Sequence, residues 1–277
     1  MSYQVDGKKG LPSSFQALGI QIGDIRCALM VKNAKVYHRE AFRKLERLYH
    51  GFLTKELTDI TIELEGTDRF GPSDLDTVLS DTRYIHDENC FRTTSNLIDG
   101  QYDLTRHSIR ITGEKSLADR NLEMNHLNKL LALAYYSACK VKYDGNPPAM
   151  LVHACGILRR GRVFIFAGPS EAGKTTIARL CGKRDGEVIN DEMLLVSRPT
   201  THDRGINVRS VPVLGRFLSR PHITAPLCCI LLLKKSSQTQ VHPIDKTEAY
   251  LRFMRQIITP AYIGQKDRRA TGQALAR

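Results

Sequence analysis

The chain has 277 residues, of which 42% are hydrophobic and 25% are charged, a balance typical of a globular protein with room for two domains. Its 41 basic and 29 acidic residues give a net charge of +12, scattered along the chain rather than gathered in blocks. No apolar run approaches the roughly 20 residues that span a bilayer, and the sequence does not begin with a basic segment followed by an apolar core. We therefore expect a cytoplasmic protein without a membrane partner. Because no helix-turn-helix, zinc finger or aromatic-basic platform is present, we also expect no nucleic-acid partner.

Short strands and two helices are predicted in the first half of the chain. Apolar residues gather in strand fashion over residues 18–31, and helical spacing follows over residues 38–52. Strict alternation predicts further strands over residues 60–65 and 108–112. A long apolar stripe then predicts a helix over about residues 117–140. Together these patterns indicate a strand-rich α+β module.

The connector between the two halves is marked by Gly145, Pro147 and Pro148, which end the preceding helix sharply. We place a domain boundary there. The predicted parts are a smaller α+β N-terminal domain over residues 1–145, a second domain over residues 146–262 and a polar tail over residues 263–277.

The second half opens with the apolar segment of residues 150–153. A nearly continuous apolar run over residues 162–167 comes next, with the pattern of a strand buried on both faces. A helix is expected from Lys174 to about Gly182, followed by a strand over residues 187–191. The remaining predicted elements are strands over residues 193–197, 206–213 and 227–233, and a helix that starts at a capping box of Asp245 and Glu248 and runs through residue 257.

Between the first strand and helix of this half lies the pattern GxxxxGK[ST], at residues 168–175. A strand–loop–helix context is what a phosphate-binding loop needs, because backbone N–H groups and the positive end of the helix can then face an anion. Lys174 would reach the β- and γ-phosphates, and the Thr175 hydroxyl could hold Mg²⁺. The alternative is a glycine-rich turn with an ordinary surface lysine. The predicted ATP-binding residues are Gly168, Pro169, Ser170, Glu171, Ala172, Gly173, Lys174, Thr175 and Thr176.

Two adjacent acids, Asp191 and Glu192, end the strand that follows the loop helix. If this strand lies beside the strand of residues 162–167 in a parallel sheet, the carboxyl ends of the two strands meet at the same edge. The acids would then lie next to the phosphate loop, where phosphoryl transfer needs a carboxylate for the metal and one for the acceptor. The alternative is that Asp191 only caps a turn.

The order of these features resembles the C-terminal domain of bacterial HPr kinase/phosphorylase and of its HPr-kinase-related relatives. Three features carry the resemblance: the loop of residues 168–176, His153 fifteen residues upstream in a strand–turn context, and the Asn190-Asp191-Glu192 sequence after the loop helix. It covers roughly residues 148–258, and the first half matches only as a variable N-terminal domain. The implied fold is α/β, with a central mixed β-sheet in a P-loop domain.

Carried over residue by residue, the resemblance implies an ATP- and Mg²⁺-dependent kinase that transfers the γ-phosphate to a serine hydroxyl of a protein or peptide. Asp191 takes the place of the general base, and His153 that of the active-site histidine near the phosphates. Taken without the resemblance, His153 would be a histidine at a strand edge. The implied catalytic set is Asp191, His153 and Lys174, and the implied Mg²⁺ ligands are Thr175, Asp191 and Glu192. Because HPr kinases are hexamers, the resemblance also implies a homo-oligomer.

Several residues depart from the family pattern. Pro169 and Glu171 stand where HPr kinases commonly have an aspartate and a second glycine, and Thr175 and Thr176 replace a Ser-Glu pair. The segment of residues 207–216 does not align with the family's Pro-Arg-Gly-Arg-like stretch. The chain is therefore more similar to the divergent relatives, which include kinases of peptide precursors of modified natural products.

Two other functions fit the same residues. One is a nucleotide-responsive regulator without catalysis, which the altered loop favours. The other is a small-molecule kinase or a carboxykinase-type enzyme, because the loop also resembles that of ATP-dependent phosphoenolpyruvate carboxykinase. In any phosphoryl transfer an arginine can stabilise the charge of the moving group. The candidates are Arg209, Arg216 and Arg220.

Overall fold

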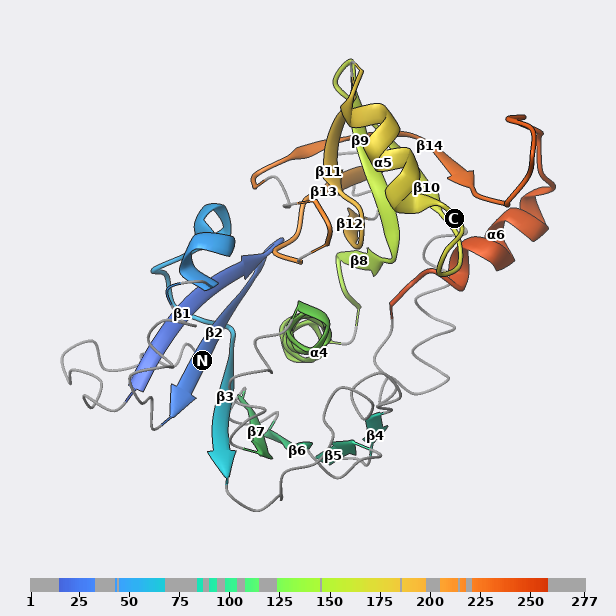
Figure 1. The fold of residues 1–277 in the computed structure, drawn as a ribbon. Coiled ribbons are helices and arrows are strands. Elements are labelled where there is room, and N and C mark those ends of the chain that lie inside the picture. Colours follow the sequence, from blue (N-terminus) through green and yellow to red (C-terminus); the bar gives the residue numbers. More distant parts are fainter. Residues whose placement is uncertain are drawn as a thin grey trace. The chain divides into compact units, whose positions relative to one another are not determined.

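The structure is a computed structural model that shows a mixed α/β protein with two mixed β-sheets and few helices in its described parts (Figure 1). It divides into two compact units, Met1–Gly145 with Pro260–Gly264 and Asn146–Thr259 with Gln265–Arg277. The described residues are 15–32, 43, 45–67, 84–86, 90–93, 98–103, 108–114, 124–144, 146–184, 186–197, 205–213, 215–217 and 221–258.

The first unit contains a seven-stranded sheet in the order β1-β2-β3-β7-β6-β5-β4. Its strands are β1 (Phe15–Ile22), β2 (Ile25–Lys32), β3 (Ile60–Thr67), β4 (Tyr84–His86), β5 (Cys90–Thr93), β6 (Ile98–Asp103) and β7 (Ser108–Glu114). The central strands β2, β3 and β7 are parallel, and the outer pairs are antiparallel. Ile60 and Ile62 are buried while Thr61 and Glu63 are half-buried, which accounts for the alternation seen in the sequence.

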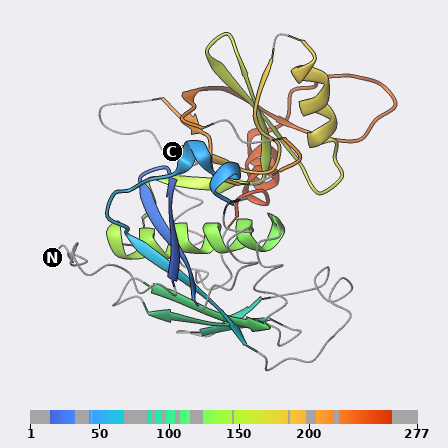
Figure 2. The same ribbon diagram turned by 60° about the vertical axis from the view of Figure 1, so that its left-hand side comes forward.

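The helix α4 (Met124–Lys142) contacts β2 and β3 and runs along this sheet (Figure 2). All ten residues from Leu130 to Cys139 are buried. The predicted helix over residues 117–140 is confirmed from Met124 onward and extends to Lys142, whereas its expected start lies outside the described residues. Within the other helix prediction, at 38–52, Arg43 and residues 45–48 are helical and the 3₁₀ helix η1 (His50–Phe52) follows.

The second unit contains a seven-stranded sheet in the order β11-β9-β10-β14-β13-β12-β8. Its strands are β8 (Ala149–Val152), β9 (Ala154–Arg159), β10 (Arg162–Ala167), β11 (Glu187–Asn190), β12 (Leu194–Ser197), β13 (Asn207–Arg209) and β14 (Thr224–Leu232). The long strand β14 joins the two halves of the sheet, because its start pairs with β13 and the remainder pairs with β10. Val163, Ile165 and Ala167 of β10 point into the main core of the unit.

The prediction of which strand lies beside β10 was wrong. We predicted that the strand ending in Asp191 lies directly beside β10 in a parallel sheet, but β9 lies between them and pairs antiparallel with both. The reason is that β9 and β10 form a hairpin, whose turn begins with Arg160, a residue that is unusual at this position. Because β10 and β11 are each antiparallel to β9, they run in the same direction, so their carboxyl ends still lie at the same edge of the sheet.

Two helices cover the second unit. The helix α5 (Lys174–Gly182) packs on β9, β11 and β10, and its Ala178 joins Cys155, Ile157 and Val188 in a small apolar cluster. The helix α6 (Lys246–Met254) begins at Asp245, whose Oδ1 accepts bonds from the N–H groups of Thr247 and Glu248, as the capping sequence predicts. Among the described helices none is long and apolar enough to cross a membrane.

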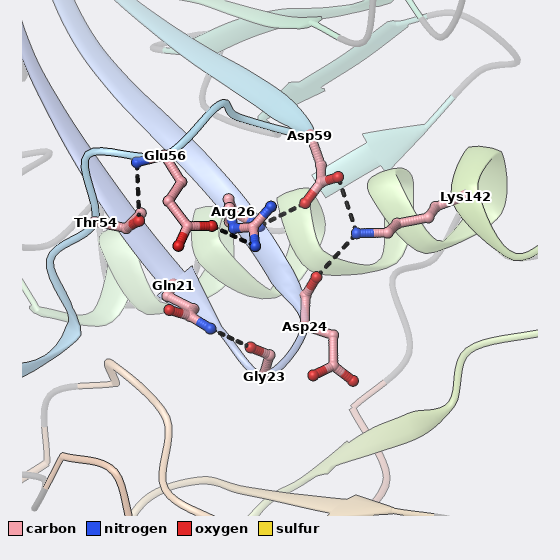
Figure 3. A network of polar contacts seen from close by, with 8 residues as sticks. All are labelled: Gln21, Gly23, Asp24, Arg26, Thr54, Glu56, Asp59 and Lys142. Carbon is pink, nitrogen blue, oxygen red and sulfur yellow. Dashed lines mark hydrogen bonds and ion pairs between the residues drawn. The ribbon is translucent and has the colours of Figure 1, made fainter. Parts of the chain in front are cut away.

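In the first unit, the carboxylate of Asp59 connects the end of α4 to the start of β2 (Figure 3). Asp59 Oδ2 accepts a 2.8 Å bond from the backbone N–H of Arg26, and Asp59 Oδ1 accepts a 3.0 Å bond from Lys142 Nζ. The same ammonium donates to the carbonyl of Asp24, and the Arg26 side chain pairs with Glu56. One carboxylate thus joins elements that are 83 residues apart in the sequence.

We predict that Asp59→Ala lowers the free energy of unfolding by about 1–3 kcal/mol, because it leaves the backbone N–H of Arg26 without this acceptor and removes one of the two acceptors of Lys142 Nζ. Glu56→Ala is the matched control, since it also removes one carboxylate but breaks a solvent-exposed pair that contributes at most about 1 kcal/mol. Urea unfolding of the two variants measures the difference. Equal losses in the two variants would contradict this role for Asp59.

Candidate functional site

The loop between β10 and α5 leaves the sheet at Gly168. A Cβ at this position would lie 2.9 Å from the Cβ of Ala172 and 3.4 Å from Leu233, so the site has room for glycine alone without a shift of its neighbours. The N–H of Leu233 donates to the carbonyl of Ala167 at 2.8 Å, which continues the pairing of β10 with β14 up to the loop. The start of the loop is therefore held firmly by the sheet.

The middle of the loop turns through two left-handed residues. Glu171 has a φ of +62°, and Gly173, which caps α5, has a φ of +109°. Between them, the N–H of Ala172 donates to the carbonyl of Pro169 at 3.2 Å. Gly173 has no side chain with which to cap α5, so the N–H groups of the first helical turn are suited to an external anion.

Lys174 folds back onto the loop that precedes it. Its Nζ donates to the carbonyls of Gly168 at 2.8 Å and Pro169 at 3.0 Å, and the residue is 7% exposed. Burial lowers the pKa of Lys174, and the nearby carboxylate of Glu192 opposes that shift. The loop carbonyls thus satisfy an ammonium that burial alone would disfavour.

The turn after β11 is organised by the side-chain amide of Asn190, which is fully buried. Its Nδ2 donates to the carbonyl of Val213 at 2.7 Å, and its Oδ1 accepts bonds from the N–H groups of Glu192 and Met193 at 2.7 and 2.9 Å. The amide therefore fixes the turn internally and attaches it to the segment that follows β13. These three bonds fix the backbone of the turn that carries Asp191 and Glu192.

Asp191 is held against the segment of residues 215–217. Its carboxylate accepts a 3.2 Å bond from the N–H of Phe217, and the residue is 2% exposed. A Cβ on Gly215 would lie 2.2 Å from Asp191 Oδ1, a distance that no real Cβ tolerates. The absence of a side chain at Gly215 is what admits the carboxylate.

His153 and Glu192 approach each other at the same edge. His153 Nε2 lies 3.6 Å from Glu192 Oε1, and the backbone N–H of His153 donates to the carbonyl of Gln256. Burial, and then the charge of Lys174, lowers the pKa of His153. Burial, and then the charge of Asp191, raises the pKa of Glu192, while Lys174 opposes the rise. These shifts disfavour a fully charged His153–Glu192 pair.

The structure thus brings four of the predicted site residues into one electrostatic cluster: His153, Lys174, Asp191 and Glu192. Thr175 and Thr176 lie in the first turn of α5, directly after the lysine. Pro169, Ser170 and Glu171 are exposed on the loop. Within the described residues, no group of three or more histidines, cysteines, aspartates or glutamates is arranged to hold a metal ion.

Of the arginine candidates that the structure describes, Arg216 lies between Gly215 and Phe217, in the segment that holds Asp191. It is exposed. Arg209 lies within β13, in register with Leu195 of β12 and Thr224 of β14. Arg220 lies outside the described residues. The geometry therefore favours Arg216 as the arginine next to the acids.

Asn190 and Gly215 were not predicted to have roles in the site. Asn190 directly precedes the acid pair, and an asparagine at a strand end is a common signal for a turn held by its side chain. Gly215 gives no comparable signal, because its close neighbour is 24 positions earlier in the sequence.

No known family model matches this chain, and a search of curated proteins finds no match.

We predict that Gly215→Ala destabilises the protein by about 1–3 kcal/mol, because the new methyl group overlaps the buried carboxylate. Gly182→Ala, at the end of α5, is the control. Its Cβ would make an ordinary 3.5 Å contact with Val188, and alanine in a helix stabilises by about 0.5–1 kcal/mol relative to glycine. Thermal unfolding of both variants should give shifts of opposite sign. A neutral Gly215→Ala would show that Asp191 is not packed there.

We also predict that Glu171→Gly stabilises the protein by about 1 kcal/mol, because the left-handed conformation costs a residue with a side chain about 1–2 kcal/mol and glycine almost nothing. Part of the gain is lost to the greater freedom of glycine in the unfolded chain. Ser170→Gly in the same loop, where φ is not positive, should be destabilising instead. Chemical denaturation measures both, and a loss of stability in Glu171→Gly would contradict the observed backbone conformation.

Proposed function

We propose that this protein is an ATP- and Mg²⁺-dependent kinase that transfers the γ-phosphate to a serine hydroxyl of a protein or peptide. The observation that carries the proposal is the electrostatic coupling of Lys174, at the start of α5, with Glu192, which follows β11 next to Asp191. A glycine-containing loop before a helix provides for phosphate binding. Adjacent acids provide for metal binding and proton abstraction.

In this proposal the triphosphate replaces the loop carbonyls as the partner of Lys174. The ammonium is now bonded to Gly168 and Pro169. A phosphate oxygen carries negative charge whereas a carbonyl oxygen is neutral, so the ammonium would bind a nucleotide phosphate more strongly than its present partners. The first N–H groups of α5 would contact the same phosphates.

Asp191 is the proposed general base. Its carboxylate takes the proton of the acceptor hydroxyl while the serine oxygen bonds to the γ-phosphorus, and the bond from that phosphorus to the bridging oxygen breaks to release ADP. The bond from Phe217 N–H holds one carboxylate oxygen in place, which leaves the other for the proton. His153, whose pKa burial lowers, would contact the phosphates as a neutral imidazole.

The described residues fit a magnesium ion that arrives with the nucleotide rather than one bound by protein alone. Magnesium commonly takes one or two carboxylates together with phosphate oxygens and water. Here the Thr175 hydroxyl, Asp191 and Glu192 are the residues that would hold it. When bound, the ion would neutralise charge on the phosphates.

The 2% exposure of Asp191 favours a second candidate, a regulator that binds nucleotide and changes its partners without catalysis. A base must come within hydrogen-bonding reach of the acceptor hydroxyl. In the regulator, nucleotide binding would instead move the segment of residues 215–217, because the buried Asp191 carboxylate is bonded to the N–H of Phe217. This candidate requires nucleotide-dependent association with a partner and no phosphate transfer.

The test is incubation with γ-labelled ATP and a lysate from the protein's own source, with nucleotide binding measured separately. We expect a discrete labelled acceptor with the wild-type protein. Asp191→Asn should bind ATP normally and lose label transfer by about 10²–10⁴-fold, the usual contribution of a general base. Lys174→Ala should lose ATP binding, whereas the exposed Lys183→Ala should change neither property. Full transfer by Asp191→Asn would refute the proposed base, and ATP binding with no transfer by the wild type would favour the regulator.

A further inference from the structure

The hairpin between β9 and β10 concentrates positive charge at the end of the sheet away from the phosphate loop. Arg159 ends β9, Arg162 begins β10, and the two lie directly opposite each other in the antiparallel register. The two-residue turn between them is Arg160 and Gly161, with φ values of +51° and +72°. All four residues are exposed.

The three arginines line a cavity of about 270 Å³. Its fourth described lining residue is Phe164, which is half-buried and belongs to the same strand as Arg162. The described lining thus consists of three arginines and one aromatic residue and contains no acidic residue.

This arrangement works against the stability of the hairpin. Like charges directly opposite each other in an antiparallel pair repel. The first turn position, which requires a positive φ, is usually taken by asparagine, aspartate or glycine rather than arginine. Arg159 has a further interaction within the protein, so the inference depends chiefly on Arg160 and Arg162. Strained residues that persist in this way commonly mark binding sites.

We propose that this hairpin pocket binds a small, multiply charged anion that carries phosphate, such as a phosphate ester or a diphosphate. Guanidinium groups pair with phosphate oxygens through two parallel hydrogen bonds, and a bound anion would compensate the positive charges of Arg160 and Arg162. The cavity is slightly smaller than the usual pocket of about 300–1,000 Å³ for a drug-sized ligand, so a small ligand fits best.

The hairpin pocket is separate from the proposed nucleotide site. Arg162 and Ala167 are at opposite ends of β10, and a strand rises about 3.3 Å per residue. About 17 Å of strand therefore separates the pocket from the loop that begins at Gly168. The proposal goes beyond the kinase function and does not depend on it.

The test is calorimetric titration of pyrophosphate into the Lys174→Ala protein, whose phosphate loop lacks its ammonium. We expect one binding site, weakened about tenfold by adding Arg160→Gly, because one charge-assisted interaction is lost. Arg160→Gly also relieves the positive φ, so the variant keeps its fold. Adding Arg162→Ser should weaken binding by a similar factor. The exposed Lys235→Ser, outside the pocket, is the control for net charge and should have no effect.

Several outcomes would overturn the proposal. One is that the Lys174→Ala protein does not bind pyrophosphate. Another is that adding Arg160→Gly and adding Lys235→Ser leave the same affinity for pyrophosphate. A third is that single-stranded RNA displaces pyrophosphate with an affinity that grows with the length of the RNA. A site in the wild type that Arg160→Gly removes and Lys174→Ala leaves intact would support the hairpin pocket. If the wild type shows only one such site and binds no ATP, the hairpin pocket stands and the proposed kinase function fails.

Discussion

The buried side-chain amide of Asn190 connects the end of β11 to the carbonyl of Val213, 23 residues later, and at the same time holds the N–H groups of Glu192 and Met193. A polar group buried without a partner costs several kcal/mol by its desolvation, so breaking these bonds would strongly destabilise the protein. They determine where Asp191 and Glu192 lie. They also hold the following chain close enough for Gly215 and Phe217 to enclose Asp191.

The strand β9 gives the site its geometry from the other side. It pairs antiparallel with β10 and with β11, so the loop that follows one strand and the acids that follow the other lie at the same edge. His153 immediately precedes β9 and therefore lies at that edge as well. Gly156, within β9, allows Leu194 of β12 to pack closely, since a Cβ there would lie 2.7 Å from Leu194 Cδ2. This contact between Gly156 and Leu194 cannot be predicted from the residues that neighbour either one in the sequence.

The parts of the fold that sequence could predict are those set by neighbouring residues. Alternation located β3, a continuous apolar run located β10, and a capping aspartate located the start of α6. The order of strands could not be predicted in the same way. The hairpin of β9 and β10 depends on a turn through Arg160 and Gly161, and arginine is not a usual residue for it. The partner of Asp191 is Phe217, 26 residues away, and no spacing rule identifies such a pair.

Two residues of the phosphate loop, Pro169 and Glu171, differ from the HPr kinase pattern, and the structure shows what each does in the loop. Glu171 stands where the family that the loop resembles commonly has a glycine, and its backbone has the left-handed conformation that glycine favours, with a φ of +62°. Pro169 supplies a carbonyl that accepts from both Ala172 N–H and Lys174 Nζ.

The loop is therefore internally satisfied before any anion arrives, and its lysine already has two acceptors. In the proposed function a phosphate would replace those two carbonyls, so its affinity would depend on the difference between bonds of Lys174 to a charged acceptor and bonds to the neutral acceptors now present. Glu171 adds a negative charge beside the same loop, and this charge opposes an anion at distances within the Debye length of about 10 Å. If the loop binds phosphate as proposed, Glu171 would lower its affinity relative to glycine at the same position, with the same left-handed backbone conformation.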